Sequence, residues 1–189
     1  MAKKILQKEE KVLRQVAKEI PVKDIKTVKI KKVLKEMSGA LAGQSDGVAI
    51  AAPQIGYSLR VFVVSGKIFE KNFIENRNER MSGEKNKNEA TEVIPKIKDL
   101  VFINPKISKL SREKEWMPEG CLSVRPLYGK TFRSKKATVE AYDEDGKKFK
   151  RGASGLLAQI FQHETDHLNG ILFIDHAKDV KAEEPLPKK

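Results

Sequence analysis

Cysteine and long apolar runs are scarce in this sequence of 189 residues, and each shortage excludes a class of protein. Cys121 is the only cysteine, which excludes an internal disulfide and favours a reducing compartment. No apolar run approaches the roughly 18–20 residues of a membrane-spanning helix. The first residues also lack the apolar stretch of a signal peptide. We therefore expect a cytoplasmic protein with no membrane partner.

Negative charge is also in short supply. The chain has 38 lysines and arginines against 26 aspartates and glutamates, which gives a formal net charge of +12. This excess favours contact with polyanions such as the RNA of a ribosome, although lysines scattered over a solvated surface would give the same count. Lysine far outnumbers arginine, which suits diffuse attraction better than the reading of bases. We expect possible ribosome contact and no specific DNA target.

The length predicts a single domain over residues 1–189, large enough to bury one core. Residues 66–97 are rich in lysine, glutamate and asparagine, so we expect a charged surface insertion there. A loose tail is expected from about residue 180. The remainder mixes helical and strand patterns without regular alternation, which favours an α+β fold.

Hydrophobic spacing predicts two helices within this domain. The first is expected over residues 28–41, with Thr27 or Asp24 as its N-cap. The second is expected over residues 155–168, with Ser154 as its N-cap. The strands, one hairpin included, are expected at 59–64, 100–105 and 137–150.

The second helix carries an H-E-x-x-H pattern, formed by His163, Glu164 and His167. Residues four apart lie on one face of a helix, so both imidazoles can reach one metal ion. Glu164 points from the adjacent face, where it can touch a water on that ion. Leu156 and Ile160 share the histidine stripe and supply an apolar wall beside it.

A catalytic ion of this kind takes three protein ligands and keeps one position open. In one large metalloprotease class the third ligand is a histidine at the position that Phe173 occupies here, so that interpretation lacks its deciding residue. His176 is a possible ligand without further support. Cys121 is the remaining soft donor, although a lone cysteine is also a common core residue. One thiolate and two imidazoles suit Zn(II), Fe(II), Ni(II) or Co(II).

Three short motifs in this order resemble those of the peptide deformylase family. The first is GVAIAAPQI at residues 47–55, the second is EGCLS at residues 119–123, and the third is QHETDH at residues 162–167. The resemblance implies antiparallel sheets packed around a central helix that carries the metal histidines. It also implies removal of the N-formyl group from the initiator N-formylmethionine of nascent polypeptides, with release of formate.

Residue by residue, the resemblance implies that Cys121, His163 and His167 hold one divalent ion, Fe(II) in the cell and Zn(II) as a poorer replacement. Glu164 matches the general acid and base. The side chain of Gln54 and the backbone N–H of Leu122 match the groups that stabilise a developing oxyanion.

Other positions match the family's methionine pocket. They are Val48, Leu156 and Ile160, which Met117 is expected to join. Ala49 stands where the family usually has glycine, and its methyl group would crowd the strand that pairs with substrate. Gln159 is expected to bring polarity to the pocket edge. Asp166 is expected either to form an ion pair or to orient a metal ligand.

Two other functions compete with this hypothesis. One is a metallopeptidase of the H-E-x-x-H type, which the missing histidine at Phe173 argues against. The other is a basic RNA-binding module with a structural metal site, which the net charge of +12 motivates. A structural site would be closed by a fourth protein ligand, whereas an open position indicates catalysis.

Overall fold

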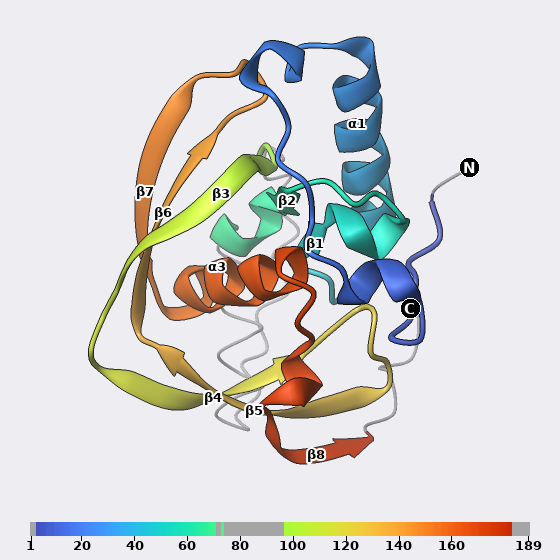
Figure 1. Cartoon of the computed structure of the whole chain (residues 1–189). Helices are drawn as coiled ribbons and strands as arrows, with labels where there is room; N and C mark the ends of the chain where they lie inside the picture. The colour runs from blue at the N-terminus through green and yellow to red at the C-terminus, as the bar shows by residue number, and fades with distance from the viewer. Residues whose placement is uncertain (1–2, 71–72, 74–96, 183–189) are drawn as a thin grey trace.

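Two antiparallel sheets and two long helices form the part of the chain that the computed structural model describes, residues 3–70, 73 and 97–182 (Figure 1). One sheet has five strands in the order β1-β2-β3-β6-β7, and the other has three in the order β4-β5-β8. The strands of the first sheet are β1 (Ala49–Ala51), β2 (Val61–Val64), β3 (Leu100–Leu110), β6 (Lys136–Tyr142) and β7 (Lys148–Ser154). The strands of the second are β4 (Lys114–Gly120), β5 (Leu127–Ser134) and β8 (Lys178–Ala182). This is the α+β architecture that the sequence predicts.

The helix α3 (Gly155–Leu168) lies between the two sheets and packs against β1, β5, β6 and β7 (Figure 1). Its Phe161 ring contacts Phe62 of β2 and Phe102 of β3, with centroid distances of 6.3 and 5.2 Å. All three rings are fully buried. This cluster holds α3 on the five-stranded sheet and so fixes the position of the histidine motif near the end of the helix.

The predicted first helix is confirmed as α1 (Val28–Ala42). Thr27 is its cap, because the hydroxyl of Thr27 accepts a hydrogen bond from the N–H of Ile30. Ser154 occupies the corresponding position before α3, but its hydroxyl makes no capping hydrogen bond. The buried face of α1 covers β1 and β2. It consists of Ile30, Val33, Leu34, Met37, Ala40 and Leu41.

The strand predictions are confirmed for most of the five-stranded sheet. β2, β3 and the β6–β7 hairpin overlap the expected ranges, and β3 continues to Leu110. The predictions missed β1, β4, β5 and β8. Several inward positions of β4 and β5 carry polar side chains, among them Glu119, Thr131 and Arg133. These strands therefore lack the alternation of apolar and polar residues that marks a half-buried strand.

The C-terminal strand corrects one expected boundary. β8 continues to Ala182, so residues 180–182 are strand rather than the start of a loose tail. Residues 183–189 and most of the insertion predicted at 66–97 lie outside the described residues. The first part of that insertion, Gly66–Phe69, is a short 3-10 helix. Within the described ranges, no helix has the length and apolar character needed to cross a membrane.

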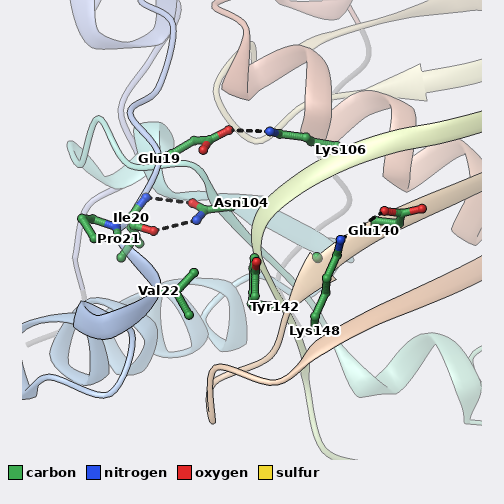
Figure 2. Close-up of a pocket in the computed structure, with 10 residues that line it drawn as sticks. Glu19, Ile20, Pro21, Val22, Asn104, Lys106, Glu140, Tyr142 and Lys148 are labelled. Carbon is green, nitrogen blue, oxygen red and sulfur yellow. Dashed lines mark hydrogen bonds and ion pairs between the residues drawn. The ribbon is translucent and has the colours of Figure 1, made fainter.

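The N-terminal arm is held against β3 by Asn104, whose backbone φ is +50° (Figure 2). The side chain of Asn104 accepts from the N–H of Ile20 at 2.8 Å and donates to its carbonyl at 2.7 Å. These residues line an open surface pocket of about 420 Å³. Closer to the N-terminus, the N–H of Leu6 donates to the carbonyl of Gln54 at 2.8 Å. The arm therefore supports the segment that carries Gln54.

Removing the ring of Phe161 tests how far this packing fixes α3. We expect Phe161→Ala to lower the free energy of unfolding by about 3–5 kcal/mol, because it removes a large apolar side chain and leaves a cavity. The control is Val16→Ala, since Val16 is 68% exposed and should change stability by less than about 0.5 kcal/mol. Urea denaturation of both variants measures the difference. Equal effects would contradict the assigned role of Phe161.

Candidate metal centre

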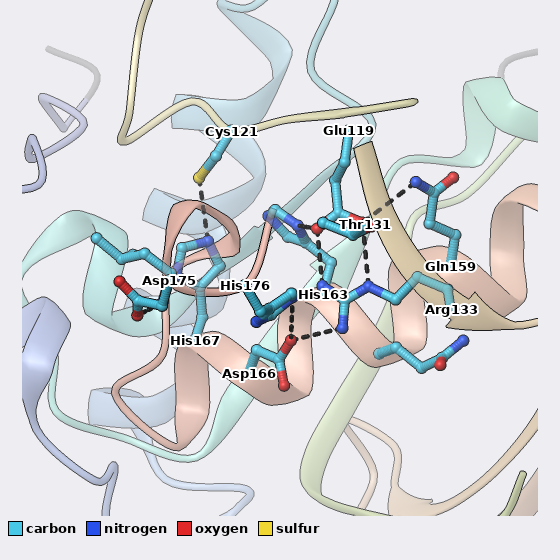
Figure 3. Close-up of polar contacts among 12 residues, drawn as sticks. Glu119, Cys121, Thr131, Arg133, Gln159, His163, Asp166, His167, Asp175 and His176 are labelled. Atoms are coloured by element: carbon cyan, nitrogen blue, oxygen red, sulfur yellow. Dashed lines mark hydrogen bonds and ion pairs between the residues drawn. The ribbon is translucent and has the colours of Figure 1, made fainter. Parts of the chain in front are cut away.

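Three potential metal ligands converge at the end of β4 and on α3. Cys121 directly follows β4, and His163 and His167 lie one turn apart on α3. Their ligand atoms all lie within 4.8 Å of one another, and Cys121 Sγ is 3.1 Å from His167 Nε2 (Figure 3). The structure therefore brings together the three side chains that the sequence nominates.

The chemistry of this group fits a divalent metal ion. A thiolate and two imidazoles are the donors that Zn(II), Fe(II), Co(II) and Ni(II) prefer. Among the residues that the structure describes, no fourth histidine, cysteine or carboxylate belongs to the group. Three protein donors are the number found in catalytic sites, where a further position stays open for water or substrate. His176 is not part of the group and lies instead near Asp166, with its Nε2 3.9 Å from the carboxylate.

Glu119, the penultimate residue of β4, orients the first histidine (Figure 3). Glu119 Oε1 is 2.7 Å from His163 Nδ1, which leaves Nε2 of that ring for an ion. Thr131 donates to Glu119 Oε2 at 2.7 Å, and Arg133 donates to both carboxylate oxygens at 2.7 and 3.1 Å. Burial would raise the pKa of Glu119, but His163 and Arg133 hold it well below its usual range.

Arg133 also connects Glu119 to the helix that carries the histidines. Its Nη1 donates to Asp166 Oδ2 at 2.6 Å. Burial alone would lower the pKa of the guanidinium, but the carboxylates of Glu119 and Asp166 outweigh that effect and raise it. Of the two roles expected for Asp166, the structure therefore shows the ion pair, and Asp166 reaches His163 only through Arg133 and Glu119. Gln159 turns toward Glu119 Oε2 and the carbonyl of Pro118, at 3.2 and 2.9 Å.

Glu164 is a buried acid with an unused oxygen. Its side chain is 3% exposed, and its Oε2 has no hydrogen-bond partner. Burial raises the pKa of Glu164 from 4.5 to about 7, with His163 opposing the shift and Glu119 and Asp166 adding to it. A carboxyl group with a pKa near neutrality is suited to both accepting and donating a proton.

Gln54 lies on the other side of the cysteine. Its Oε1 accepts from the N–H of Ala51 at 2.8 Å, which directs its Nε2 toward Cys121 Sγ at 3.6 Å. Leu122 is the residue after Cys121, and its carbonyl accepts from Gln7 Nε2 at 3.1 Å. Both expected oxyanion donors therefore belong to segments that adjoin the candidate ligands.

The expected methionine-pocket residues are only partly brought together. Ala49 and Ile160 belong to one buried apolar cluster, and Val48 and Leu156 pack against it. Met117 is buried on β4 and lies outside this cluster. The surface pocket beside the N-terminal arm (Figure 2) is lined by none of these residues.

Sequence reasoning missed Thr131 and Arg133. The available signal was their spacing, because residues two apart on a strand point to the same face. An arginine on a buried face needs a carboxylate partner, and Glu119 lies across the β4–β5 pair. That signal depends on recognising the two strands first.

Two histidines on an H-E-x-x-H helix, a cysteine and a buried acid together have the composition of a metal-dependent hydrolase site. The model of the polypeptide deformylase family matches residues 2–183 of this chain. The chain is 36% identical to peptide deformylase 2 of Clostridium acetobutylicum over 168 residues, which cover 88% of this chain and 89% of that protein. It is 36% identical to the peptide deformylase of Carboxydothermus hydrogenoformans over 177 residues, which cover 94% of each.

Solved structures show the same likeness. The fold is similar to a class I type b peptide deformylase from Acinetobacter baumannii with Met-Ala-Ser bound, with a TM-score of 0.74, 27% identity, and coverage of 93% of this chain and 98% of that one. It is also similar to a peptide deformylase from Synechococcus elongatus in complex with actinonin, with a TM-score of 0.70, 29% identity, and coverage of 94% and 79%. This chain therefore belongs to the polypeptide deformylase family, whose members are metalloenzymes that remove the N-formyl group from the N-formylmethionine of nascent chains.

The raised pKa of Glu164 predicts a pH-dependent stability in the metal-free protein. The folded state keeps Glu164 protonated up to about pH 7, whereas the unfolded state releases that proton near pH 4.5. The neutral carboxyl therefore stabilises the fold fully below pH 4.5, and this contribution is lost as the pH rises toward 7. Relative to Glu164→Gln, the unmodified protein should lose about 3 kcal/mol between pH 4.5 and 8. Urea denaturation in a chelator measures this, and a difference between the two proteins that does not change with pH would contradict it.

Proposed function

We propose that Cys121, His163 and His167 hold one divalent ion, and that Glu164 is the acid and base of the deformylation reaction. The observation that carries this proposal is the convergence of three ligand atoms within 4.8 Å, next to a buried carboxyl group with a free oxygen. The substrate is a peptide that begins with N-formylmethionine. The products are formate and a peptide with a free amino terminus.

The ion, when bound, lowers the pKa of water and polarises the formyl carbonyl. Glu164 takes a proton from the attacking water through its unpartnered Oε2 and later gives that proton to the leaving amine nitrogen. A single buried carboxyl with a pKa of about 7 suits both transfers. Gln54 Nε2 and the backbone N–H of Leu122 donate to the oxygen of the former carbonyl as it becomes negative, each contributing about 3 kcal/mol.

The methionine side chain packs on the apolar residues beside α3. Val48, Leu156 and Ile160 belong to or pack against one apolar cluster and favour an unbranched thioether by burial. Met117 is buried on β4, on the same strand face as Glu119. The similar deformylase structure from Acinetobacter baumannii has Met-Ala-Ser bound, which supports a substrate that begins with methionine. Ala49 lies on β1, where its methyl group would weaken pairing with the substrate backbone.

For the ion in the cell we infer Fe(II), with Zn(II), Ni(II) or Co(II) able to replace it in the purified protein. A thiolate donates more charge than an imidazole, so it leaves the ion less electrophilic and favours one that changes coordination number readily. We also infer that the protein acts in the cytoplasm, where nascent chains leave the ribosome.

Replacing Glu164 with glutamine tests its role. We expect Glu164→Gln to retain one ion per chain and to lower formate release from formyl-Met-Ala by at least about 100-fold, because the amide cannot transfer the proton. Metal content and turnover are measured on the same oxygen-free sample. The control is Glu113→Gln, an exposed carboxylate outside the site, which should retain full turnover. Retained turnover in Glu164→Gln would exclude Glu164 as the acid and base.

Ribosome contact is a separate part of the proposal, and the outer face of the three-stranded sheet supports it. Trp116 and Phe132 pair across β4 and β5 with ring centroids 5.3 Å apart, and they are 43% and 51% exposed. Lys178 Nζ lies 4.9 Å from the Trp116 ring, and Lys114 Nζ lies 5.9 Å from the Phe132 ring. Exposed rings beside cations form a surface on which nucleic-acid bases can stack and phosphates can pair.

Reversing charge on this face tests the contact. We expect Lys114→Glu with Lys178→Glu to reduce cosedimentation with ribosomes by at least about fivefold at low salt, while turnover of formyl-Met-Ala stays the same. The matched control reverses two exposed lysines of α1, Lys31→Glu with Lys35→Glu, and removes the same net charge. Equal losses in both double variants would show that net charge, rather than this face, determines binding. No cosedimentation of the unmodified protein would remove ribosome contact from the proposal.

A further inference from the structure

The amide of Gln54 has a defined orientation before any substrate binds. The N–H of Ala51 donates to Oε1 at 2.8 Å, and a flipped amide would place two donors against each other there. This contact determines which end of the amide faces Cys121. It does not by itself fix the rotation of the whole amide plane about the Cγ–Cδ bond, which needs a second contact on the other side.

Ser123 supplies that partner. Its Oγ accepts a hydrogen bond from Gln54 Nε2 at 3.1 Å, and Ser123 is 0% exposed, so no bulk water competes for the contact. Gln54 itself is 1% exposed. One hydrogen of the amide is therefore committed to Ser123, and the other donates to Cys121 Sγ at 3.6 Å, which directs it toward the candidate ligands.

The backbone of Ser123 has a second contact that can be separated from the first. Its N–H donates to Cys121 Sγ at 3.4 Å. Because this donor belongs to the main chain, replacing Ser123 with alanine keeps it and removes only the hydroxyl. The variant therefore isolates the bond to Gln54.

We propose that Ser123 is a positioning residue for deformylation, whose hydroxyl fixes the Gln54 amide so that its second N–H is aimed at the developing oxyanion. The inference rests on the proposed function and deepens it. Donors aligned in advance stabilise a transition state without a cost of reorganisation, whereas an amide free to rotate must be ordered in each reaction cycle. In this proposal Ser123 acts on the reaction through Gln54 rather than through the substrate or the ion.

The direct test is the kinetics of Ser123→Ala with formyl-Met-Ala. We expect kcat to fall about tenfold with KM changed less than about twofold, because the lost alignment matters mainly in the transition state. Metal content should stay the same. Ser123→Thr keeps a hydroxyl and should recover most of kcat. The matched control is Ser134→Ala, which removes an equally buried hydroxyl that donates to the carbonyl of Ser111, and it should keep kcat.

A double-mutant cycle separates positioning of Gln54 from a general structural effect. In a Gln54→Ala background, Ser123→Ala should change kcat by less than about twofold, because the amide that it orients is gone. Equal losses in both backgrounds would overturn the proposal, as would an unchanged kcat in the single variant.

A spectroscopic readout keeps the test independent of activity. In the zinc-loaded protein, the side-chain N–H proton of Gln54 that is bonded to Ser123 should move upfield in Ser123→Ala, and its resonance is assigned by its loss in Gln54→Ala. If the unmodified protein releases no formate, the proposed function fails, yet this shift still decides whether Ser123 orients the amide. An unchanged resonance would contradict the inference.

Discussion

The meeting of Cys121 with two histidines of α3 is the contact on which the rest of the site depends. The cysteine directly follows β4 of the three-stranded sheet, while α3 is anchored on the five-stranded sheet by Phe161, so the site exists only where the two sheets face the same helix (Figure 1). The ligand atom of Cys121 and those of the two histidines then all lie within 4.8 Å of one another. The fold therefore brings the two halves of the site together.

Buried charge maintains this geometry. Glu119 joins His163 to Arg133, and Arg133 joins Glu119 to Asp166, so β4, β5 and α3 are tied by one network (Figure 3). Each charge in it has a partner, and removing one partner of a buried pair would leave the other uncompensated at about 3–5 kcal/mol. The same burial raises the pKa of Glu164, whose Oε2 has no hydrogen-bond partner, to about 7.

Much of this arrangement can be predicted from sequence, but unevenly. The spacing of His163 and His167 is sufficient to place both on one face of a helix, because helical periodicity is local. The placement of Cys121 needs contacts 42 and 46 positions away in the chain. Elimination leaves Cys121 as the remaining soft donor, and the resemblance carried by EGCLS supports that choice. β4 and β5 escaped prediction because they bury Thr131 and Arg133, whose suitability for the interior depends on Glu119. Local rules cannot find a pair of polar residues that satisfy each other across strands.

The ligand set itself is the claim to test, and X-ray absorption at the zinc edge of the zinc-loaded protein tests it most directly. The account predicts one sulfur at about 2.3 Å and two imidazole nitrogens at about 2.0–2.1 Å, with the rest of the shell made by exchangeable solvent. Cys121→Ser should remove the sulfur scatterer and keep the imidazole pattern. A spectrum without sulfur, or one that shows a third imidazole and no solvent, would contradict the assignment of Cys121, His163 and His167.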